Sequence, residues 1–198
     1  MDGTTVLFDP GIYSFESDIF DINNLSRLDY IAITHEHADH FHMPFVELLL
    51  GKFPGAKVVT TPAVESQLTG KVDVSSQSAG LFQLFEAPHE KLPTGMGDPP
   101  QNTGIHFAEV LSHPGDSHSF NETRKILAMP MTAPWGSMTG AMAKIKALKP
   151  EFVIPIHDWH WKPEVAQGMY QRFREPLKEL GIVFLIPVDG QAVEINLS

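Results

Sequence analysis

The sequence of 198 residues contains no cysteine. This absence excludes disulfide bonds, thiolate catalysis, zinc fingers and iron–sulfur clusters, because each of them needs a cysteine sulfur. A metal ion bound by this chain must therefore be held by nitrogen and oxygen atoms.

Long apolar runs and basic residues are also scarce. No run of about 18 apolar residues occurs, so the sequence predicts no transmembrane helix, and the first residues do not resemble a signal peptide. We therefore expect a cytoplasmic protein without a membrane partner.

Lys and Arg number 14 against 24 Asp and Glu, for a net charge of −10. A polyanion would be repelled on average, so we expect no nucleic-acid partner.

The composition that remains is typical of a soluble globular chain, with 42% hydrophobic and 19% charged residues. The length suffices for a core, and we expect a single domain over residues 1–198. Periodicity predicts strands at 6–8, 30–34, 57–60, 81–86, 104–111, 125–129 and 152–156. It predicts helices at 45–50, 63–68, 137–148 and 164–180. We expect closing strands at 182–186 and 192–195, joined as a hairpin at Asp189-Gly190.

These elements alternate and also pair as hairpins, which predicts a layered α/β or α+β domain. A loop rich in glycine and proline separates two of the strands, from Leu92 to Asn102.

Four metal-binding side chains stand within six residues, directly after the strand predicted at 30–34. They are His35, His37, Asp39 and His40. Residues two apart on a strand point the same way, so His35 and His37 can bind one metal, and Asp39 and His40 can reach a second. Two metals about 3.5–4 Å apart activate water and stabilise the charge of a transition state. The cluster therefore predicts a metal-dependent hydrolase with a two-metal site.

Three further candidates, His89, Asp116 and His157, each follow an apolar strand. Such a residue alone is typical of a turn or a cap, but sites assemble where strands end. Together with the cluster, these three would complete the coordination. We interpret His42 and His106 as structural, because isolated histidines are rarely ligands.

The pattern resembles the signature of the metallo-β-lactamase superfamily, from Leu7 to about Val193. The matching features, in order, are His-x-His-x-Asp-His at 35–40, His89 after a strand, the turn Gly115-Asp116-Ser117, and His157 after Ile154-Pro155-Ile156. The chain is most similar to the bacterial branch that includes the L-ascorbate-6-phosphate lactonases. That branch commonly has Lys-Pro before the last of these strands, as at Lys149-Pro150.

The resemblance implies a four-layer αββα sandwich with the site at one edge. It implies His35, His37 and His89 on the first metal. It implies Asp39, His40 and His157 on the second metal, with Asp116 bridging both. Asp9 is similar to the family's aspartate that braces the ligand loop, and such carboxylates strengthen metal binding.

The chain also departs from the family pattern. The family usually has one or two strands before the Asp9-Pro10 step. We therefore expect a short first sheet, or a sheet edge covered by a second copy, which favours a homo-oligomer. Extra histidines, His113, His118 and His160, stand near the predicted ligands. We predict His89 as the ligand in preference to His106 or His113.

The resemblance implies hydrolysis by a hydroxide that bridges the two metals. Asp39 would orient this nucleophile, and His118 or His160 would protonate the leaving group. We expect a small substrate, for which a negative charge is compatible. An ester or lactone is favoured by the resemblance. The alternatives are a small phosphodiester, or metal and ligand binding without catalysis.

Other reactions are disfavoured. The second-metal ligands include no cysteine, which argues against β-lactam hydrolysis, and a nuclease would need basic patches. A redox di-iron role is disfavoured because no flavin domain follows.

Zinc or manganese suits the ligands, and iron is compatible. Trp135, Trp159 and Trp161 flank the site segments, where they either line a pocket or pack in the core, and packing is the more common outcome.

Overall fold

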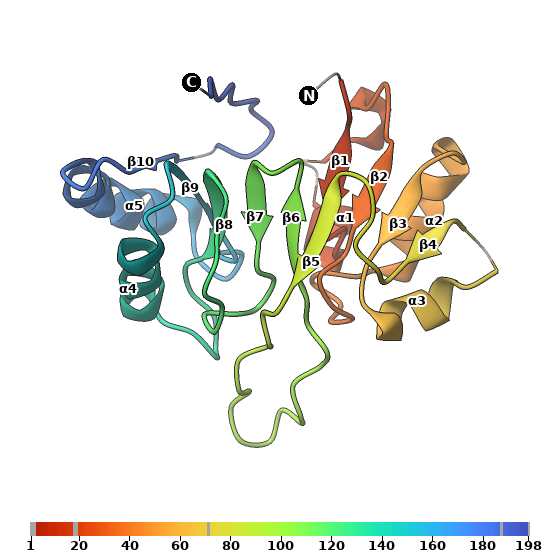
Figure 1. Cartoon of the computed structure of the whole chain (residues 1–198), viewed down its shortest axis with the longest axis horizontal. Helices are drawn as coiled ribbons and strands as arrows, with labels where there is room; N and C mark the ends of the chain where they lie inside the picture. Colours follow the sequence, from red (N-terminus) through yellow and green to blue (C-terminus); the bar gives the residue numbers. More distant parts are fainter. Residues whose placement is uncertain (1–2, 18–19, 71, 187, 198) are drawn as a thin grey trace.

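The computed structural model describes residues 3–17, 20–70, 72–186 and 188–197. Two β-sheets stack face to face, and helices cover the outer face of each (Figure 1). The first sheet has the order β1-β2-β3-β4 and is parallel throughout, with strands Val6–Phe8, Tyr30–Ala32, Lys57–Val59 and Val74–Ser75. The second sheet has the order β10-β9-β8-β7-β6-β5.

The second sheet is mixed. Strands β5 (Phe82–Phe85), β6 (Gly104–Phe107) and β7 (Leu111–His113) are antiparallel neighbours. Strands β8 (Ile126–Pro130), β9 (Phe152–Ile156) and β10 (Val183–Phe184) continue from β7 in parallel.

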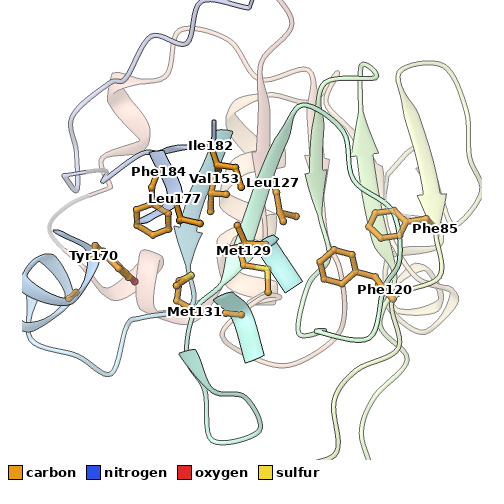
Figure 2. Close-up of a cluster of buried hydrophobic side chains, with 14 residues drawn as sticks. Phe85, Phe120, Leu127, Met129, Met131, Val153, Tyr170, Leu177, Ile182 and Phe184 are labelled. Carbon is orange, nitrogen blue, oxygen red and sulfur yellow. The ribbon is translucent and has the colours of Figure 1, made fainter. Parts of the chain in front are cut away.

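Three apolar clusters hold the layers together. Ala32 and Val59 of the first sheet meet Phe82 and Ile105 of the second. Helices α2 (Met43–Lys52) and α3 (Pro62–Leu68) cover the first sheet. Helices α4 (Met138–Leu148) and α5 (Pro163–Lys178) cover the second, over the core drawn in Figure 2. The layers therefore follow the order helix, sheet, sheet, helix, and the predicted αββα sandwich is confirmed.

Local sequence signals explain where several helices begin. The Thr61 hydroxyl accepts a hydrogen bond from Val64 N at the start of α3, and Ser137 accepts one from Gly140 N at the start of α4. Side-chain oxygens at these positions satisfy backbone donors that the helix leaves free. Among the described residues, none of the helices combines the length and the apolar character needed to cross a bilayer.

Two predicted elements differ from the structure. The strand predicted at 104–111 is divided into β6 and β7 by a turn at Ala108 and Glu109, whose φ angles are 52° and 56°. Such turns usually carry Asn or Gly, and their absence here explains why a single strand was predicted.

The predicted closing hairpin is wrong. β10 pairs with β9 in parallel, as expected for a strand that follows helix α5. The described residues 188–197 form no strand.

The ends of β2, β5, β7 and β9 lead into the loops that carry the predicted ligands. The long loop 86–103 projects from the lower edge of the molecule in Figure 1. β1 is the edge strand of the first sheet. The oligomeric state stays a prediction.

Candidate metal centre

The seven predicted ligands come together in two adjacent groups. In each group the potential ligand atoms lie within 4.8 Å of one another. The first group is His35, His37, His89 and Asp116, and the second is Asp39, His40 and His157. Residues separated by more than a hundred positions in the sequence thus converge as expected.

The carboxylate of Asp116 faces both groups. Its Oδ2 lies 3.8 Å from His35 Nε2 and 3.5 Å from His89 Nε2. Its Oδ1 lies 3.0 Å from His40 Nε2 and 3.2 Å from His157 Nε2. One oxygen toward each group is the geometry that a bridging carboxylate requires.

Asp9 holds the loop that follows β2. Its Oδ1 accepts a hydrogen bond from Thr34 N at 2.7 Å, and its Oδ2 accepts one from the Thr34 hydroxyl at 2.8 Å. The same Oδ2 lies 2.8 Å from His40 Nδ1. Burial alone would raise the pKa of Asp9, but the neighbouring His40 lowers it to about 2. The carboxylate therefore stays ionised and orients the His40 ring.

Close backbone packing fixes the same loop from the other side. Ile12 N donates to Ala38 O at 2.8 Å. A Cβ atom at Gly11 would lie 1.8 Å from Asp39 O, so only glycine fits here. Asp9 and His157 adopt φ angles of 44° and 63°, which non-glycine residues rarely do. Strain of this kind is concentrated at functional sites.

Four of the histidines use Nδ1 for support and so present Nε2 to the site. His35 Nδ1 bonds to the Thr34 hydroxyl at 3.2 Å and His40 Nδ1 bonds to Asp9. His89 Nδ1 donates to Glu90 O at 2.6 Å, and His157 Nδ1 donates to Thr132 O at 3.0 Å. A hydrogen bond at one ring nitrogen fixes the orientation of the ring and leaves the other nitrogen as the ligand.

The buried polar atoms at the centre fit a metal. His89 Nε2, His157 Nε2 and Asp116 Oδ1 are buried, and the polar atoms that face them belong to other candidate ligands. Buried polar atoms are normally satisfied. Imidazole nitrogens and a carboxylate oxygen are donors that zinc, manganese and iron accept, so these residues fit divalent metal ions.

Electrostatics keep the site charged when no metal is bound. Burial would raise the pKa of Asp116, but His40 holds it well below the usual range. Burial would lower the pKa of His157, but its contacts with Asp116 and Asp39 raise it to about 10. A metal ion must displace the His157 proton in order to bind, so its affinity is coupled to pH.

The other histidines lie outside both groups. His106 is buried, its Nδ1 lies 2.9 Å from the Ser112 hydroxyl, and its ring stacks on Phe85. His42 precedes α2 and packs against Phe15. His113 stacks on Phe8 behind the Asp9 carboxylate. None of these three rings belongs to either group of potential ligands, whereas His89 belongs to the first.

The two histidines predicted as proton donors also lie outside the groups. His118 Nε2 donates to Pro130 O at 2.8 Å. His160 is exposed, and its Nε2 lies 3.4 Å from the Thr132 hydroxyl. Their catalytic roles remain predictions.

Sequence reasoning missed Thr34 and Asn102. Asn102 Nδ2 donates to Ala87 O at 2.6 Å and Pro114 O at 2.8 Å, and Asn102 Oδ1 accepts from Asp116 N at 3.2 Å. It thereby joins the two loops that carry His89 and Asp116. A lone Asn in a loop carries no signal for such a role.

The tryptophans differ from one another. Trp161 packs against the core cluster over the second sheet, as packing would predict. Trp135 instead donates its indole N–H to Asp116 Oδ2 at 2.9 Å, and its ring lies 5.4 Å from that of His157. Trp159 is exposed, and its ring lies 6.5 Å from that of His157. Two of the three tryptophans therefore lie beside a candidate ligand.

The chain is similar to several known proteins. Protein Rv0786c of Mycobacterium tuberculosis is 27% identical over 184 residues, covering 84% of this chain and 81% of that protein. A UPF0173 metal-dependent hydrolase of Thermofilum pendens is 27% identical over 171 residues, covering 76% and 70%. The structure of Igni18, a metallo hydrolase of Ignicoccus hospitalis, matches with a TM-score of 0.70 at 17% identity, covering 100% and 93%.

A family model decides the assignment. Residues 1–157 match the model described as the beta-lactamase superfamily domain, and this stretch includes all seven candidate ligands. The chain therefore belongs to the metallo-β-lactamase superfamily.

Proposed function

We propose that the chain is a binuclear metal-dependent hydrolase that cleaves an ester or lactone bond of a small molecule. The observation that carries this proposal is the pair of ligand groups that share Asp116. Membership of the superfamily and the name of the Thermofilum pendens relative support the hydrolase class. The lactone or ester substrate rests on the resemblance to the lactonase branch.

In this proposal His35, His37 and His89 hold the first metal, and Asp39, His40 and His157 hold the second, with Asp116 between them. Zinc or manganese suits these ligands best, and iron is compatible. When bound, the two ions would lower the pKa of water toward about 7 and stabilise negative charge on the substrate oxygen.

The chain's own residues orient the water and move its proton. Asp39 Oδ2 lies 3.6 Å from His157 Nε2, and its side chain is partly exposed, so it can accept a hydrogen bond from the attacking water. The water oxygen forms a bond to the carbonyl carbon, and the bond from that carbon to the leaving oxygen breaks. Of the two protons of the water, one replaces the proton that the leaving oxygen takes from its donor, and the other passes to solvent as the carboxylate product forms.

His160 is the favoured donor of that proton, because it is exposed, while His118 is held by Pro130. General acids matter most for poor leaving groups. We therefore expect His160→Ala to lower kcat for alkyl esters more than for nitrophenyl esters. His118→Ala tests the second candidate, and unchanged turnover in the double variant would contradict both roles.

Metal analysis and a substrate panel test the proposal. Protein loaded with zinc or manganese should hold two ions per chain and turn over lactones or esters. His157→Ala should lose one ion and its turnover. His106→Asn is the control, since it changes a buried histidine outside the site and keeps a group that can bond to Ser112.

The alternatives give different results. Turnover of a chromogenic phosphodiester without lactone or ester hydrolysis would favour a phosphodiesterase. Two bound ions with no turnover on either class would favour a binding protein. A single ion per chain would contradict the binuclear assignment.

A further inference from the structure

Two exposed aromatic side chains stack beside the candidate metal centre. Among the residues that the structure describes, the exposed aromatic side chains are Tyr13, Phe15 and Trp159. Tyr13 is 45% exposed and Trp159 is 46% exposed, yet their rings stack with centroids 4.4 Å apart and planes 25° apart. An ordered apolar surface that remains open to solvent is typical of an interaction site.

Both rings are attached to segments that carry ligands of the second group. Trp159 follows the ligand His157 by two residues, and their rings lie 6.5 Å apart. Tyr13 lies on α1 (Ile12–Glu16), which bonds to the ligand loop through Ile12 N and Ala38 O at 2.8 Å. A molecule bound to the stacked rings of Tyr13 and Trp159 would therefore lie next to the second group of candidate metal ligands.

A third ring borders His157 from another direction. Trp135 lies 5.4 Å from the His157 ring and donates its N–H to Asp116. His157 is thus flanked by Trp135 and Trp159, and the stack extends from Trp159 to Tyr13. The aromatic surface is continuous with the candidate metal site.

Packing does not account for the exposed pair. Trp161, two residues further along, is the tryptophan of this segment that packs against the core. The neighbouring Asp158 accepts a hydrogen bond from the Tyr170 hydroxyl at 2.7 Å, so its charge is directed to α5 and not to the rings. Tyr13 and Trp159 therefore present ring surface to solvent, and the exposed His160 ring lies 5.2 Å from that of Trp159.

We propose that Tyr13 and Trp159 form a subsite for a flat apolar group, an aromatic ring, attached next to the bond that is cleaved. Offset stacking of aromatic rings stabilises such contacts beyond the area that they bury. As a statement about substrates, this inference rests on the proposed hydrolase function. It predicts a preference for phenyl-substituted over alkyl-substituted lactones or esters.

The first experiment compares kcat/KM of the metal-loaded chain for matched phenyl-substituted and methyl-substituted lactones. Trp159→Ala should lower kcat/KM for the phenyl substrate by about tenfold more than for the methyl substrate, through KM. Tyr13→Ala should act in the same direction, and Trp159→Phe should retain most of the preference. An equal loss for both substrates, or no loss for either, would overturn the subsite.

Phe15→Ala is the matched control. It removes an exposed aromatic ring from the same helix, but that ring packs against His42 and Phe45, not against Trp159. The preference for the phenyl substrate should survive this change. Its loss in Phe15→Ala would overturn the assignment to the stacked pair.

A binding measurement separates this inference from the hydrolase proposal. Isothermal titration with phenylacetate and acetate probes the subsite without turnover. Tighter binding of phenylacetate in the unaltered chain, lost in Trp159→Ala, would support the subsite even if no lactone or ester were hydrolysed. Equal binding of the two acids would overturn it.

Sedimentation tests the alternative that a second copy of the chain covers Tyr13 and Trp159. If the rings formed a contact between two copies, the unaltered chain would be a dimer and Trp159→Ala a monomer. That result would overturn the subsite. An unchanged oligomeric state, together with weakened phenylacetate binding, supports it.

Discussion

The Asp9 carboxylate supports the second ligand group through several hydrogen bonds. It bonds to Thr34 twice and to His40 once. Asp9→Asn keeps the shape but removes the negative charge and one acceptor. Because such supporting carboxylates are worth about 10–100-fold in metal affinity, we expect a loss of that size for one of the two ions, measured by competition with a chromogenic chelator.

The control for this prediction is Asp29→Asn. Asp29 also accepts a backbone hydrogen bond, from Thr5 N at 2.8 Å, and it pairs with Arg27. It precedes β2, whereas the ligands follow that strand. Metal affinity should be unchanged in this variant, and a similar loss in both variants would contradict the role of Asp9.

Trp135 offers a second residue-scale prediction. Trp135→Phe keeps a ring beside His89 and His157 but removes the N–H donor to Asp116. We expect weaker metal binding by about tenfold and a changed visible spectrum of the cobalt-substituted protein, because the bridging carboxylate loses an orienting bond. Trp161→Phe, in the core, should leave that spectrum unaltered. An unchanged spectrum in Trp135→Phe would show that its hydrogen bond does not position the carboxylate.

At this scale the sequence predicted which candidate ligands converge better than it predicted the residues that support them. The cluster from His35 to His40 is local, and the resemblance supplied His89, Asp116 and His157. Thr34, Asn102 and the hydrogen bond of Trp135 could not be predicted, because each depends on a contact between segments that are distant in the sequence. Composition gives no information on such contacts.

At the scale of elements, the contact between α1 and the ligand loop depends on Gly11. Gly11→Ala would place a methyl group against the backbone of Asp39, and a backbone atom cannot move aside as a flexible side chain can. Overpacking typically costs about 1–3 kcal/mol. We expect a lower melting temperature and loss of the metal bound by the Asp39 group, measured by calorimetry and metal analysis.

Gly51→Ala is the control for this element. Gly51 lies within α2, and a Cβ atom there would meet nothing within 4 Å. Replacing a helical glycine by alanine stabilises by about 0.5–1 kcal/mol. The melting temperature should therefore rise and metal content stay constant. A neutral Gly11→Ala would mean that the loop is less constrained than its contacts indicate.

Elements with strong periodicity were predictable, and those set by tertiary contacts were not. The amphipathic segments at 137–148 and 164–180 correspond closely to α4 and α5. The turn at Ala108-Glu109 contains neither Asn nor Gly, so the sequence predicted one continuous strand where the structure has β6 and β7. The apolar residues after α5 suggested a hairpin, but in the structure β10 joins the open edge of β9.

At the scale of the whole molecule, the metal site joins the two halves of the sandwich. His35, His37, Asp39 and His40 follow β2 of the first sheet. His89, Asp116 and His157 follow β5, β7 and β9 of the second. Periodicity indicated layers, but the four-layer order came from the resemblance, since which faces pack together depends on the complete set of side chains.

Metal ions should therefore stabilise the fold as a whole. A ligand at 100 times its Kd stabilises by about 2.7 kcal/mol per site, and in a chain of this size each kcal/mol raises the melting temperature by about 2–4 °C. Removing the metals with EDTA should lower the melting temperature by about 5–10 °C for each site that was filled. Adding zinc or manganese back should restore it.

Variants show whether that shift comes from the proposed centre. His157→Ala should keep only part of the metal-induced rise, because one ligand group is incomplete. His106→Asn should lower the melting temperature with and without metal, since His106 is buried between Phe85 and Ser112, but should keep the full rise. If EDTA left the unaltered chain's melting temperature unchanged while metal analysis showed that the ions had been removed, the two halves would be held by their apolar core alone. The metal centre would then have no structural role.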